Sequence, residues 1–357
     1  MRRKIWNGVQ WQLRKAFIDE YNGRFPVSDV ARQKDCADGK FLADACPGNR
    51  RWIQLMYDSF LLMPAAPSML DARDAMLAAD MARFGGANQK LMWKVFAQRG
   101  MGEDAYSVDG EDTAPIAHFG SPLESAQTTL RFATRAGDES NAAITNAKLY
   151  VGQFSMRSRP IADTDPATVI DTTSDITRLA TQNLGDTATL VPGTYDFIVV
   201  APGYGIHRFS RVLSAGTFDF TVTLPTNWAS LSKTASVVTT ATDEANIALK
   251  DTVIDDSEDT GARIGDNGLV AGAYAIVKLA GGSHRISSVN VSTAAGPNNP
   301  GRFTALRAFE LLACSGSCDT PDAFTKVIYT SPADAFPSFL IRPVQNDLFI
   351  KSFSFAP

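Results

Sequence analysis

The segment from Pro67 to Gly102 constrains the fold of this sequence most, because it encodes two short helices with marked ends. Ser68 stands at an N-cap position, and Asp71 three residues later can complete a capping box. Gly85-Gly86 ends the first helix, since glycine readily adopts the left-handed conformation at a helix C-terminus. The sequence therefore predicts two helices joined by a glycine turn.

The two helices differ in their predicted buried faces. In the second, Asn88 is expected to act as the cap and Arg99-Gly100 to close the helix. Its buried stripe is predicted to be Leu91, Met92, Val95 and Phe96. One face of the first helix carries Ala72, Ala75, Met76, Ala79 and Ala82. The charged residues expected to lie largely off that face are Asp71, Arg73, Asp74, Asp80 and Arg83. The alanine row would let another backbone approach closely, but we expect it to lack a partner within residues 1–105 and to expose apolar surface.

Two further helices are predicted upstream. Ile5, Val9, Leu13 and Phe17 recur every four residues, which indicates an amphipathic helix that ends at Asn22-Gly23. Residues 24–50 are interpreted as a polar loop. A helix capped by Asn49 is then expected to end before the prolines at 64 and 67. Its predicted inward residues are Trp52, Leu55, Met56 and Phe60.

Several blocks of this helical region resemble a known family. DARDAMLAAD, GGANQKLMWKVFAQRGMG, WIQL at 52–55, Met63-Pro64 and IWNGVQWQLRKAFIDEYNG occur in the order found at the C-terminal end of fungalysin-type (M36) secreted zinc metallopeptidases. The resemblance implies a thermolysin-like fold for residues 1–110, with the helices at Ile5–Tyr21 and Ser68–Gly100 forming one wall of an active-site cleft. It further implies an extracellular enzyme in which zinc-polarised water attacks a peptide bond of a protein or peptide substrate.

The zinc motif of that family, His-Glu-x-x-His with a downstream glutamate, is absent from this sequence. The resemblance places it before Met1, so we expect this chain to be the C-terminal part of a peptidase that by itself binds no catalytic zinc and cleaves nothing. The three histidines, His118, His207 and His284, are widely spaced and are interpreted as structural. A three-histidine metal site built from three modules is the alternative.

No other catalytic pattern stands out. The sequence lacks a Gly-x-Ser-x-Gly nucleophile elbow and a phosphate-binding glycine loop. The paired carboxylates Asp19, Glu20, Asp71 and Asp74 are interpreted as helix-end and capping charges. We therefore assign no catalytic, cofactor-binding or metal-binding residue.

After Tyr106, alternation with a period of two replaces helical spacing. The predicted strands include LRFATRA, NAKLYVGQF, TYDFIVVAPGYG and TFDFTVTLP. Through the segment GDTATLVPGTYDFIVVAPGYGIHRF, the region around 115–225 resembles the carboxypeptidase regulatory-like β-sandwich. From Trp228, an acidic loop, the segment IVKLAGGSHRISSVNVS and an aromatic-rich strand follow in an order that resembles a galactose-binding-like (discoidin-type) jelly roll. Such a jelly roll usually closes with one more strand beyond Phe353–Phe355, so its C-terminus is expected to be cut. The predicted fold class is multidomain α+β, with a helical lobe at 1–110 followed by two β-sandwich modules at 111–225 and 226–357.

Composition and cysteine spacing exclude some functions. The 357 residues carry a formal net charge of −4 with no basic stripe, which argues against a nucleic-acid partner. No apolar run approaches the ~18 residues that a membrane span needs. Cys36 with Cys46, and Cys314 with Cys318, read as two disulfide-closed loops of an exported protein, with free thiols and a zinc knuckle as alternatives.

The C-terminal region offers two ligand hypotheses. An acidic run could bind calcium or form a solvated loop, and it consists of Asp251, Asp255, Asp256, Glu258, Asp259 and Asp266. Trp228 and Phe339 could grip a sugar or pack in a core. The alternative function is thus a non-enzymatic module that binds carbohydrate or cell-surface material.

Overall fold

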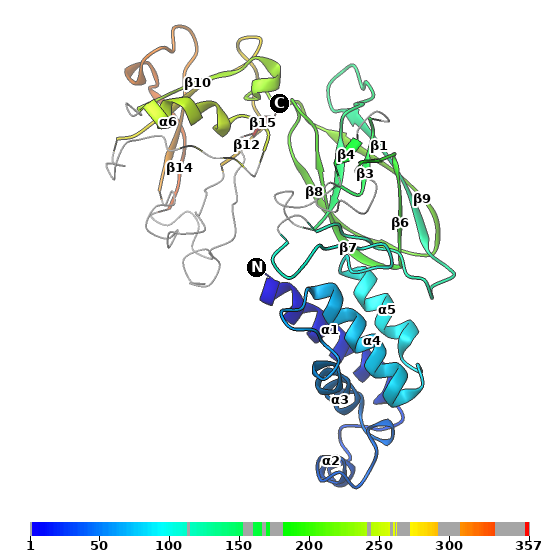
Figure 1. Cartoon of the computed structure of the whole chain (residues 1–357). Coiled ribbons are helices and arrows are strands. Elements are labelled where there is room, and N and C mark those ends of the chain that lie inside the picture. The colour runs from blue at the N-terminus through cyan, green and yellow to red at the C-terminus, as the bar shows by residue number, and fades with distance from the viewer. Residues whose placement is uncertain are drawn as a thin grey trace.

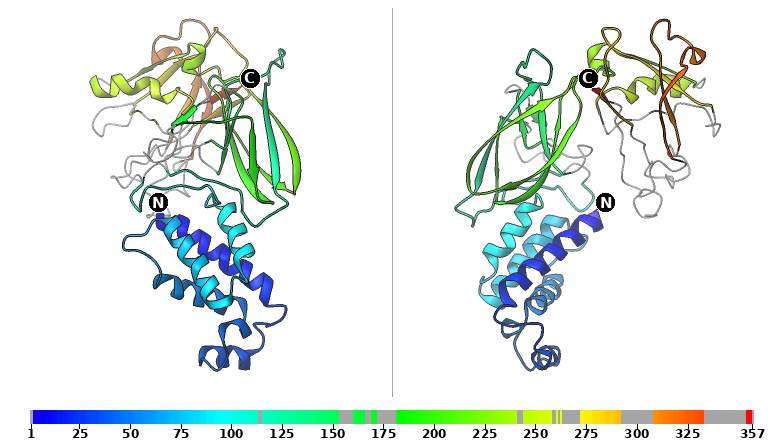
Figure 2. Two further views of the ribbon diagram at one scale, coloured as in Figure 1. Left: turned by 45° about the vertical axis from the view of Figure 1, so that its right-hand side comes forward. Right: turned by 180° about the vertical axis from the view of Figure 1, so that it is seen from behind.

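The computed structural model describes residues 2–112, 115–152, 160–165, 169–171, 181–240, 244–257, 260, 262, 272–291, 308–332 and 354–356. It contains both helices and sheets, as the α+β prediction requires. Helices α1–α5 form one end of the molecule, which we call the helical part (Figures 1 and 2). Strands β1–β9 form the first sheet unit, next to α5, and the elements from β10 to β15 form the second sheet unit, beside the first (Figures 1 and 2). The predicted domain limits at 110 and 225 stay predictions.

The helical part consists of α1 (Arg2–Tyr21), α2 (Val30–Ala37), η1 (Ala43–Ala45), α3 (Gly48–Phe60), α4 (Met69–Phe84) and α5 (Gln89–Gln98). Helix α1 contacts α3 and α5, and α4 contacts the same two helices, so four helices close around one core. The buried residues of that core are Val9, Leu13, Phe17, Leu55, Met76, Leu77, Ala79, Met92, Val95, Phe96 and Met101. Each large apolar side chain buried there contributes about 1.5–3 kcal/mol.

The helix ends largely follow the sequence signals. Ser68 and Asp71 form the predicted capping box of α4, and Gly85 ends that helix in the left-handed conformation. Asn88 occupies the N-cap position of α5, but the prediction that its side chain caps the helix is wrong, because that side chain is bonded elsewhere. Helix α3 begins at Gly48, one residue before the predicted cap.

Other helical predictions need correction. The alanine row is covered within the chain, since Ala72, Ala75 and Ala79 are buried, while Ala82 is exposed. Ile5 and Phe60 are exposed because they lie at the outer ends of α1 and α3. Residues 24–50 contain α2 and η1, so they are not simply a polar loop. None of the helices in the described ranges is long and apolar enough to cross a bilayer.

The first sheet unit contains all four predicted strands, together with β6 and β8, which the sequence patterns did not single out. Its strands are β1 (Thr128–Ala136), β2 (Lys148–Val151), β3 (Ala162–Asp163), β4 (Val169–Asp171), β5 (Thr181–Asn183), β6 (Thr187–Leu190), β7 (Gly193–Val200), β8 (His207–Leu213) and β9 (Gly216–Leu224). One sheet has the order β6-β1-β9, in which β1 pairs antiparallel with β6 and parallel with β9. A second sheet has the order β3-β2-β7-β8. Both sheets contribute to one buried core, which includes Leu130 and Val222 from the first and Leu149 and Phe197 from the second.

The second sheet unit is described over β10 (Ser236–Thr239), α6 (Glu244–Leu249), β11 (Ala275–Lys278), β12 (Ser288–Asn290), β13 (Glu310–Ala313), β14 (Lys326–Thr330) and β15 (Ser354–Ala356), with 3-10 turns at η2 (Leu231–Lys233), η3 (Lys250–Val253) and η5 (Pro321–Ala323). Its described strands pair as β10-β11, β12-β15 and β13-β14. Its described buried core is Ala229, Ala235, Val237, Val253, Ile254 and Ala280.

Candidate functional site

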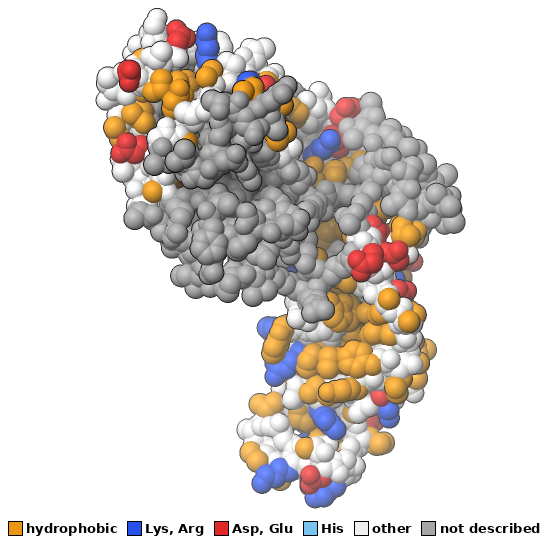
Figure 3. All heavy atoms as spheres, turned by 60° about the vertical axis from the view of Figure 1, so that its left-hand side comes forward, with side chains coloured by type: hydrophobic (Ala, Val, Ile, Leu, Met, Phe, Trp, Pro, Cys, Tyr) orange, Lys and Arg blue, Asp and Glu red, His pale blue; other side chains and the backbone are white. Residues whose placement is uncertain are grey.

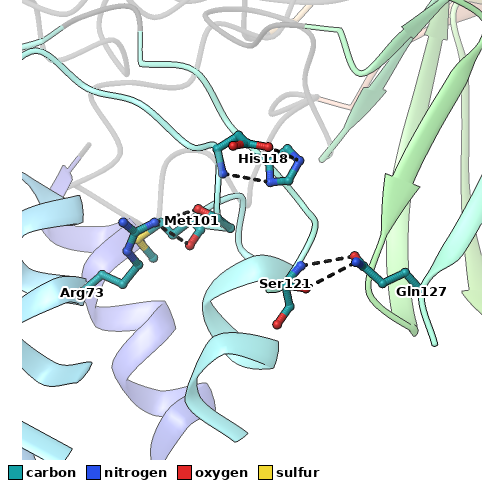
Figure 4. Close-up of polar contacts among 7 residues, drawn as sticks. Arg73, Met101, His118, Ser121 and Gln127 are labelled. Atoms are coloured by element: carbon teal, nitrogen blue, oxygen red, sulfur yellow. Dashed lines mark hydrogen bonds and ion pairs between the residues drawn. The ribbon is translucent and has the colours of Figure 1, made fainter. Parts of the chain in front are cut away.

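A buried arginine on α4 holds the chain where it leaves the helical part (Figure 4). The Nη1 atom of Arg73 donates hydrogen bonds to the carbonyl oxygens of Met101, at 3.2 Å, and Gly102, at 2.7 Å. Its Nε donates to Asp74 Oδ1 at 2.7 Å, and its guanidinium lies 4.9 Å from the ring centroid of Trp93. Arg73 was expected on the polar side of α4. It is buried instead, because it donates hydrogen bonds to carbonyl groups of the segment that follows α5.

Backbone pairing then joins this exit segment to the chain that enters the first sheet unit. Gly102 N donates to His118 O at 2.7 Å, and His118 N donates to Gly100 O at 2.9 Å. A Cβ at Gly102 would lie 2.3 Å from the carbonyl oxygen of Gly120, so this close approach requires glycine. On the sheet side, Ser121 and Gln127 bond each other (Figure 4).

The junction connects two hydrophobic cores. Met101 belongs to the core of the helical part, whereas Phe119 belongs to the core of the first sheet unit. Gln98, the last residue of α5, donates from Nε2 to Pro192 O at 3.1 Å, and Val191 N donates to Phe119 O at 2.9 Å. The first sheet unit is therefore fixed to the helical part through side chains and backbone at once.

The three histidines lie in three different places. At the junction, His118 Nδ1 accepts a hydrogen bond from Asp104 N at 3.2 Å, and its Nε2 lies 3.5 Å from Asp104 Oδ2 (Figure 4). His207 begins β8 with its ring centroid 5.4 Å from that of Phe209, and partial desolvation lowers the pKa of its imidazole. His284 lies in the loop before β12 and stacks on Trp228 with ring centroids 3.6 Å apart.

These positions do not fit a zinc centre. Among the residues that the structure describes, no three His, Cys, Asp or Glu side chains stand together in a way that could hold a metal ion. The imidazoles of His118, His207 and His284 are each engaged with a different local partner. The described residues of this chain therefore supply no set of ligands for a catalytic zinc ion.

The acidic run is engaged by protein groups where the structure describes it. Asp251 pairs with Lys250 at 2.5 Å, and Asp255 accepts hydrogen bonds from Ser257 N and Thr260 Oγ1. Asp256 accepts hydrogen bonds from Gly203, Asn227 and Ser230. Glu258, Asp259 and Asp266 lie outside the described residues. A calcium site is not shown.

The sugar-binding candidates and the paired carboxylates have local roles. Trp228 is half-buried with one ring face covered by His284, and Phe339 lies outside the described residues. Asp19 pairs with Lys15 one helical turn earlier, and Asp71 completes the capping box, as predicted for helix charges. Asp74 bonds Arg73 and Glu20 is exposed on α1.

Both predicted disulfides are present, and none of the four cysteines is free. Cys36 is bonded to Cys46, and Cys314 is bonded to Cys318. The free-thiol and zinc-knuckle alternatives are therefore wrong.

The pattern analysis missed a buried polar network in the helical part. Asp80 was expected off the buried face, yet its side chain is fully buried. Its Oδ2 accepts from Asn88 N at 3.0 Å and from Gln89 Nε2 at 3.1 Å, and its Oδ1 accepts from Asn88 Nδ2 at 2.6 Å. Asp80 thus accepts a hydrogen bond from the backbone N–H of the N-cap residue Asn88, one of the donors left without a partner at the start of a helix, where the α5 dipole favours a negative charge. The signal was available, because Ala72, Met76 and Asp80 follow one another at four-residue spacing.

The network extends to α1 and α3. The Tyr21 hydroxyl donates to Asn88 Oδ1, and the Arg51 guanidinium lies 3.8 Å from the Tyr21 ring centroid. Burial raises the pKa of Tyr21, although the positive charge of Arg51 acts against this. Burial likewise lowers the pKa of Arg51. All four helices of the ring therefore contribute to one polar centre.

The helical part also carries exposed apolar side chains. Figure 3 shows hydrophobic side chains gathered over this end of the molecule. The exposed large hydrophobic residues among residues 5–108 are Ile5, Trp11, Val27, Val30, Phe41, Leu42, Tyr57, Phe60, Leu61, Leu62, Met81 and Val108. Leu61 reaches 85% exposure and Trp11 65%, so both side chains are largely open to solvent.

Comparison with known proteins agrees with the boundaries of the helical part. Residues 2–105 match the family model described as Fungalysin metallopeptidase (M36). The helical part is fungalysin-like. This match begins with α1 and ends beyond α5, so it covers the whole helical ring.

Individual relatives share the same segment. Extracellular metalloproteinase 3 of Trichophyton tonsurans is 34% identical over 101 residues, which cover 28% of this chain and 14% of that protein. Extracellular metalloproteinase 3 of Trichophyton soudanense is 33% identical over 101 residues, 28% of this chain and 24% of that protein. The chain thus spans about a seventh of the length of the first of these relatives. Among solved structures, phospholipase PlaB of Legionella pneumophila aligns at 11% identity over 44% of this chain and 36% of that one. The TM-score of 0.17 is too low to indicate a shared fold.

Proposed function

We propose that the helical part is the C-terminal helical lobe of the catalytic unit of an extracellular zinc metalloendopeptidase of the fungalysin type, which acts on protein or peptide substrates. The observation that carries this proposal is the coincidence of the family match, residues 2–105, with the closed ring of α1, α3, α4 and α5. The two disulfides support an extracellular location, because such bonds persist in oxidising compartments.

The proposal assigns the zinc ligands to a part of the protein outside this sequence. The sequence contains no His-Glu-x-x-His motif, and the described residues do not bring its histidines together. The role proposed for this chain is to form one wall of the active-site cleft. Exposed apolar side chains such as Trp11, Tyr57 and Leu61 support that role, since they are the kind of surface that a second lobe would cover.

The sheet units are proposed to be accessory modules of the same enzyme. The core shared by the β6-β1-β9 and β3-β2-β7-β8 sheets supports a β-sandwich of the carboxypeptidase regulatory-like kind. For residues 226–357, the jelly-roll assignment stays a prediction. No observation favours carbohydrate binding, because one face of Trp228 is occupied by His284.

A chimera tests the proposal. The matching segment of the Trichophyton rubrum Extracellular metalloproteinase 3, which is 33% identical over 101 residues, would be replaced by residues 2–105 of this chain. We expect a folded, zinc-containing protein whose peptide hydrolysis is abolished by a chelator. As matched controls, Asp19→Ala on the exposed face of α1 should keep this activity, whereas Asp80→Ala in the buried network should lose it with the fold.

Two outcomes would contradict the proposal. A chimera that folds and holds zinc but hydrolyses no peptide would show that the helical part cannot serve as a peptidase lobe. Chelator-sensitive proteolysis by the unmodified 357-residue chain would show that the zinc ligands lie within it.

A further inference from the structure

The chain passes from the first to the second sheet unit without an exposed linker. Leu224, Thr226 and Asn227 are all buried. Gly205 N donates to Pro225 O at 2.8 Å, and Asn227 N donates to Gly203 O at 3.0 Å. Linkers between independently moving domains are normally exposed and make few contacts. This connecting segment is instead buried and hydrogen-bonded, as residues in a protein interior are.

The carboxylate of Asp256, in the second sheet unit, forms hydrogen bonds to this connecting segment and to the first sheet unit. Asp256 Oδ2 accepts hydrogen bonds from Gly203 N, at 2.9 Å, and from the Ser230 hydroxyl, while its Oδ1 accepts from Asn227 Nδ2 at 2.8 Å. Gly203 lies in the turn between β7 and β8 of the first sheet unit, and Ser230 lies in the second sheet unit. Hydrogen bonds to an ionised acceptor are stronger than those between neutral groups.

The backbone at Asp256 is held in an uncommon conformation. Its φ of +61° lies in the left-handed region, which few residues other than glycine adopt and which aspartate and asparagine tolerate best among them. The preceding residues Val253 and Ile254 are buried in the core of the second sheet unit, and Leu231 N donates to Ile254 O at 2.8 Å. Asp256 is therefore anchored in the second unit while its side chain reaches the first.

The neighbouring carboxylates make a useful contrast. Asp255 bonds Ser257 and Thr260, which belong to its own segment, and Asp251 pairs with the adjacent Lys250. Asp256 differs from them in that its carboxylate accepts a hydrogen bond from Gly203 of the first sheet unit.

We propose that Asp256 is the lock of a rigid joint between the two sheet units, so that they present one continuous surface rather than two mobile modules. The acidic segment then has a mechanical role at this residue, carried by hydrogen bonds rather than by a bound cation. This joint is independent of the peptidase function proposed above.

Hydrogen exchange measured by mass spectrometry on the full chain tests the lock. The readouts are peptides that cover residues 201–206 and 226–231, together with the radius of gyration from small-angle X-ray scattering. Asp256→Asn keeps the shape and the left-handed tendency but replaces one acceptor oxygen by an amide donor. Asp256→Gly removes the carboxylate and places at this position a residue that adopts the positive φ without steric cost. Ser230→Ala removes a single donor, and Asp255→Asn is the matched control.

We expect Asp256→Asn and Asp256→Gly to speed exchange in both peptides by about tenfold or more, with a larger radius of gyration. Ser230→Ala should have a smaller effect of the same sign, and Asp255→Asn should behave like the unchanged chain. Equal behaviour of Asp256→Asn and Asp255→Asn would overturn the proposal, as would an Asp256→Gly variant that exchanges like the unchanged chain. Loss of protection throughout β10 in the Asp256 variants would also overturn it, because the residue would then be needed for folding rather than for the joint. Slower exchange of the unchanged chain on adding calcium chloride, absent in Asp256→Asn, would identify a cation site instead.

Discussion

In the helical part, α1, α3, α4 and α5 surround one core, whereas the described strands of the second sheet unit pair only two at a time. The helical core contains large side chains such as Phe17, Leu55 and Phe96, and a buried polar network ties its helices together. The described core of the second sheet unit consists of alanine, valine and isoleucine side chains. We therefore expect comparable substitutions to lower the free energy of unfolding more in the helical part than in the second sheet unit.

The largest expected effect is at Asp80. Asp80→Ala removes an acceptor for three hydrogen bonds from Asn88 and Gln89 and leaves the two donors of Asn88 buried without it. We expect a loss of about 3–4 kcal/mol in the free energy of unfolding of the helical part, measured by urea denaturation. Asp19→Ala, which removes an exposed carboxylate, should change it by less than about 0.5 kcal/mol. Equal effects of the two substitutions would show that the network is not a source of stability.

The two disulfides provide the second comparison. Cys36–Cys46 joins buried residues ten positions apart, and replacing both by serine should cost the helical part about 2–3 kcal/mol. Cys314–Cys318 closes a loop with a separation of four between β13 and β14, so its double serine variant should destabilise less. Thermal unfolding followed by circular dichroism measures both, and a larger effect of the second pair would reverse the comparison.

A matched pair of valines separates the two cores directly. Val9 and Val237 are both buried, the first among the large side chains of the helical core and the second among small ones. Val9→Ala should lower the free energy of unfolding by about 2 kcal/mol, and Val237→Ala by about 1 kcal/mol. The second loss is smaller because the small side chains around Val237 make fewer contacts that a cavity would remove. Hydrogen exchange of peptides from α1 and β10 would report each loss locally. A larger loss at β10 would mean that the second sheet unit packs more tightly than its described core indicates.

The smallest expected effect concerns pH. Burial raises the pKa of Asp58, but hydrogen bonds from Arg83 and Gln54 outweigh it and hold the pKa below its ordinary value. A carboxyl group with a lowered pKa in the folded state stabilises the fold above the ordinary value of about 3.9, and this contribution is lost as pH falls through the folded pKa. We expect Asp58→Asn to cost about 0.5 kcal/mol at neutral pH and to make little difference near pH 2. An effect of the same size at both pH values would exclude the charge as its cause.

Sequence patterns predicted the parts of this fold that depend on local spacing. The capping box at Ser68, the left-handed Gly85, the four predicted strands β1, β2, β7 and β9 and both disulfides are present as expected. Residues were misplaced where a polar group is buried by a distant partner. Arg73 and Asp80 were expected off the buried face because they are charged, yet Met101, Gly102 and Asn88 supply the hydrogen bonds that allow their burial.

The contacts that join one region to another could not be predicted from the sequence patterns either. Nothing in the spacing of the acidic run distinguishes Asp256 from Asp255, because their difference lies in Gly203, which is more than fifty residues away in the chain. The pairing of Gly102 with His118 likewise depends on where the first sheet unit comes to rest. Such contacts are set by tertiary packing, which local periodicity does not encode.

The parallel pairing of β1 with β9 affects the order in which the protein can fold during synthesis. Strand β1 is the middle strand of its sheet, but its partner along one edge, β9, is the last strand of the first sheet unit to be translated. The helical ring, by contrast, is complete once α5 has left the ribosome. Contacts between distant residues form slowly, so we expect a nascent chain with a folded helical base and an open β1 edge until residues 216–224 emerge. During that interval β1 presents an unpaired edge to other nascent chains, so we expect translation that stalls before Gly216 to favour aggregation.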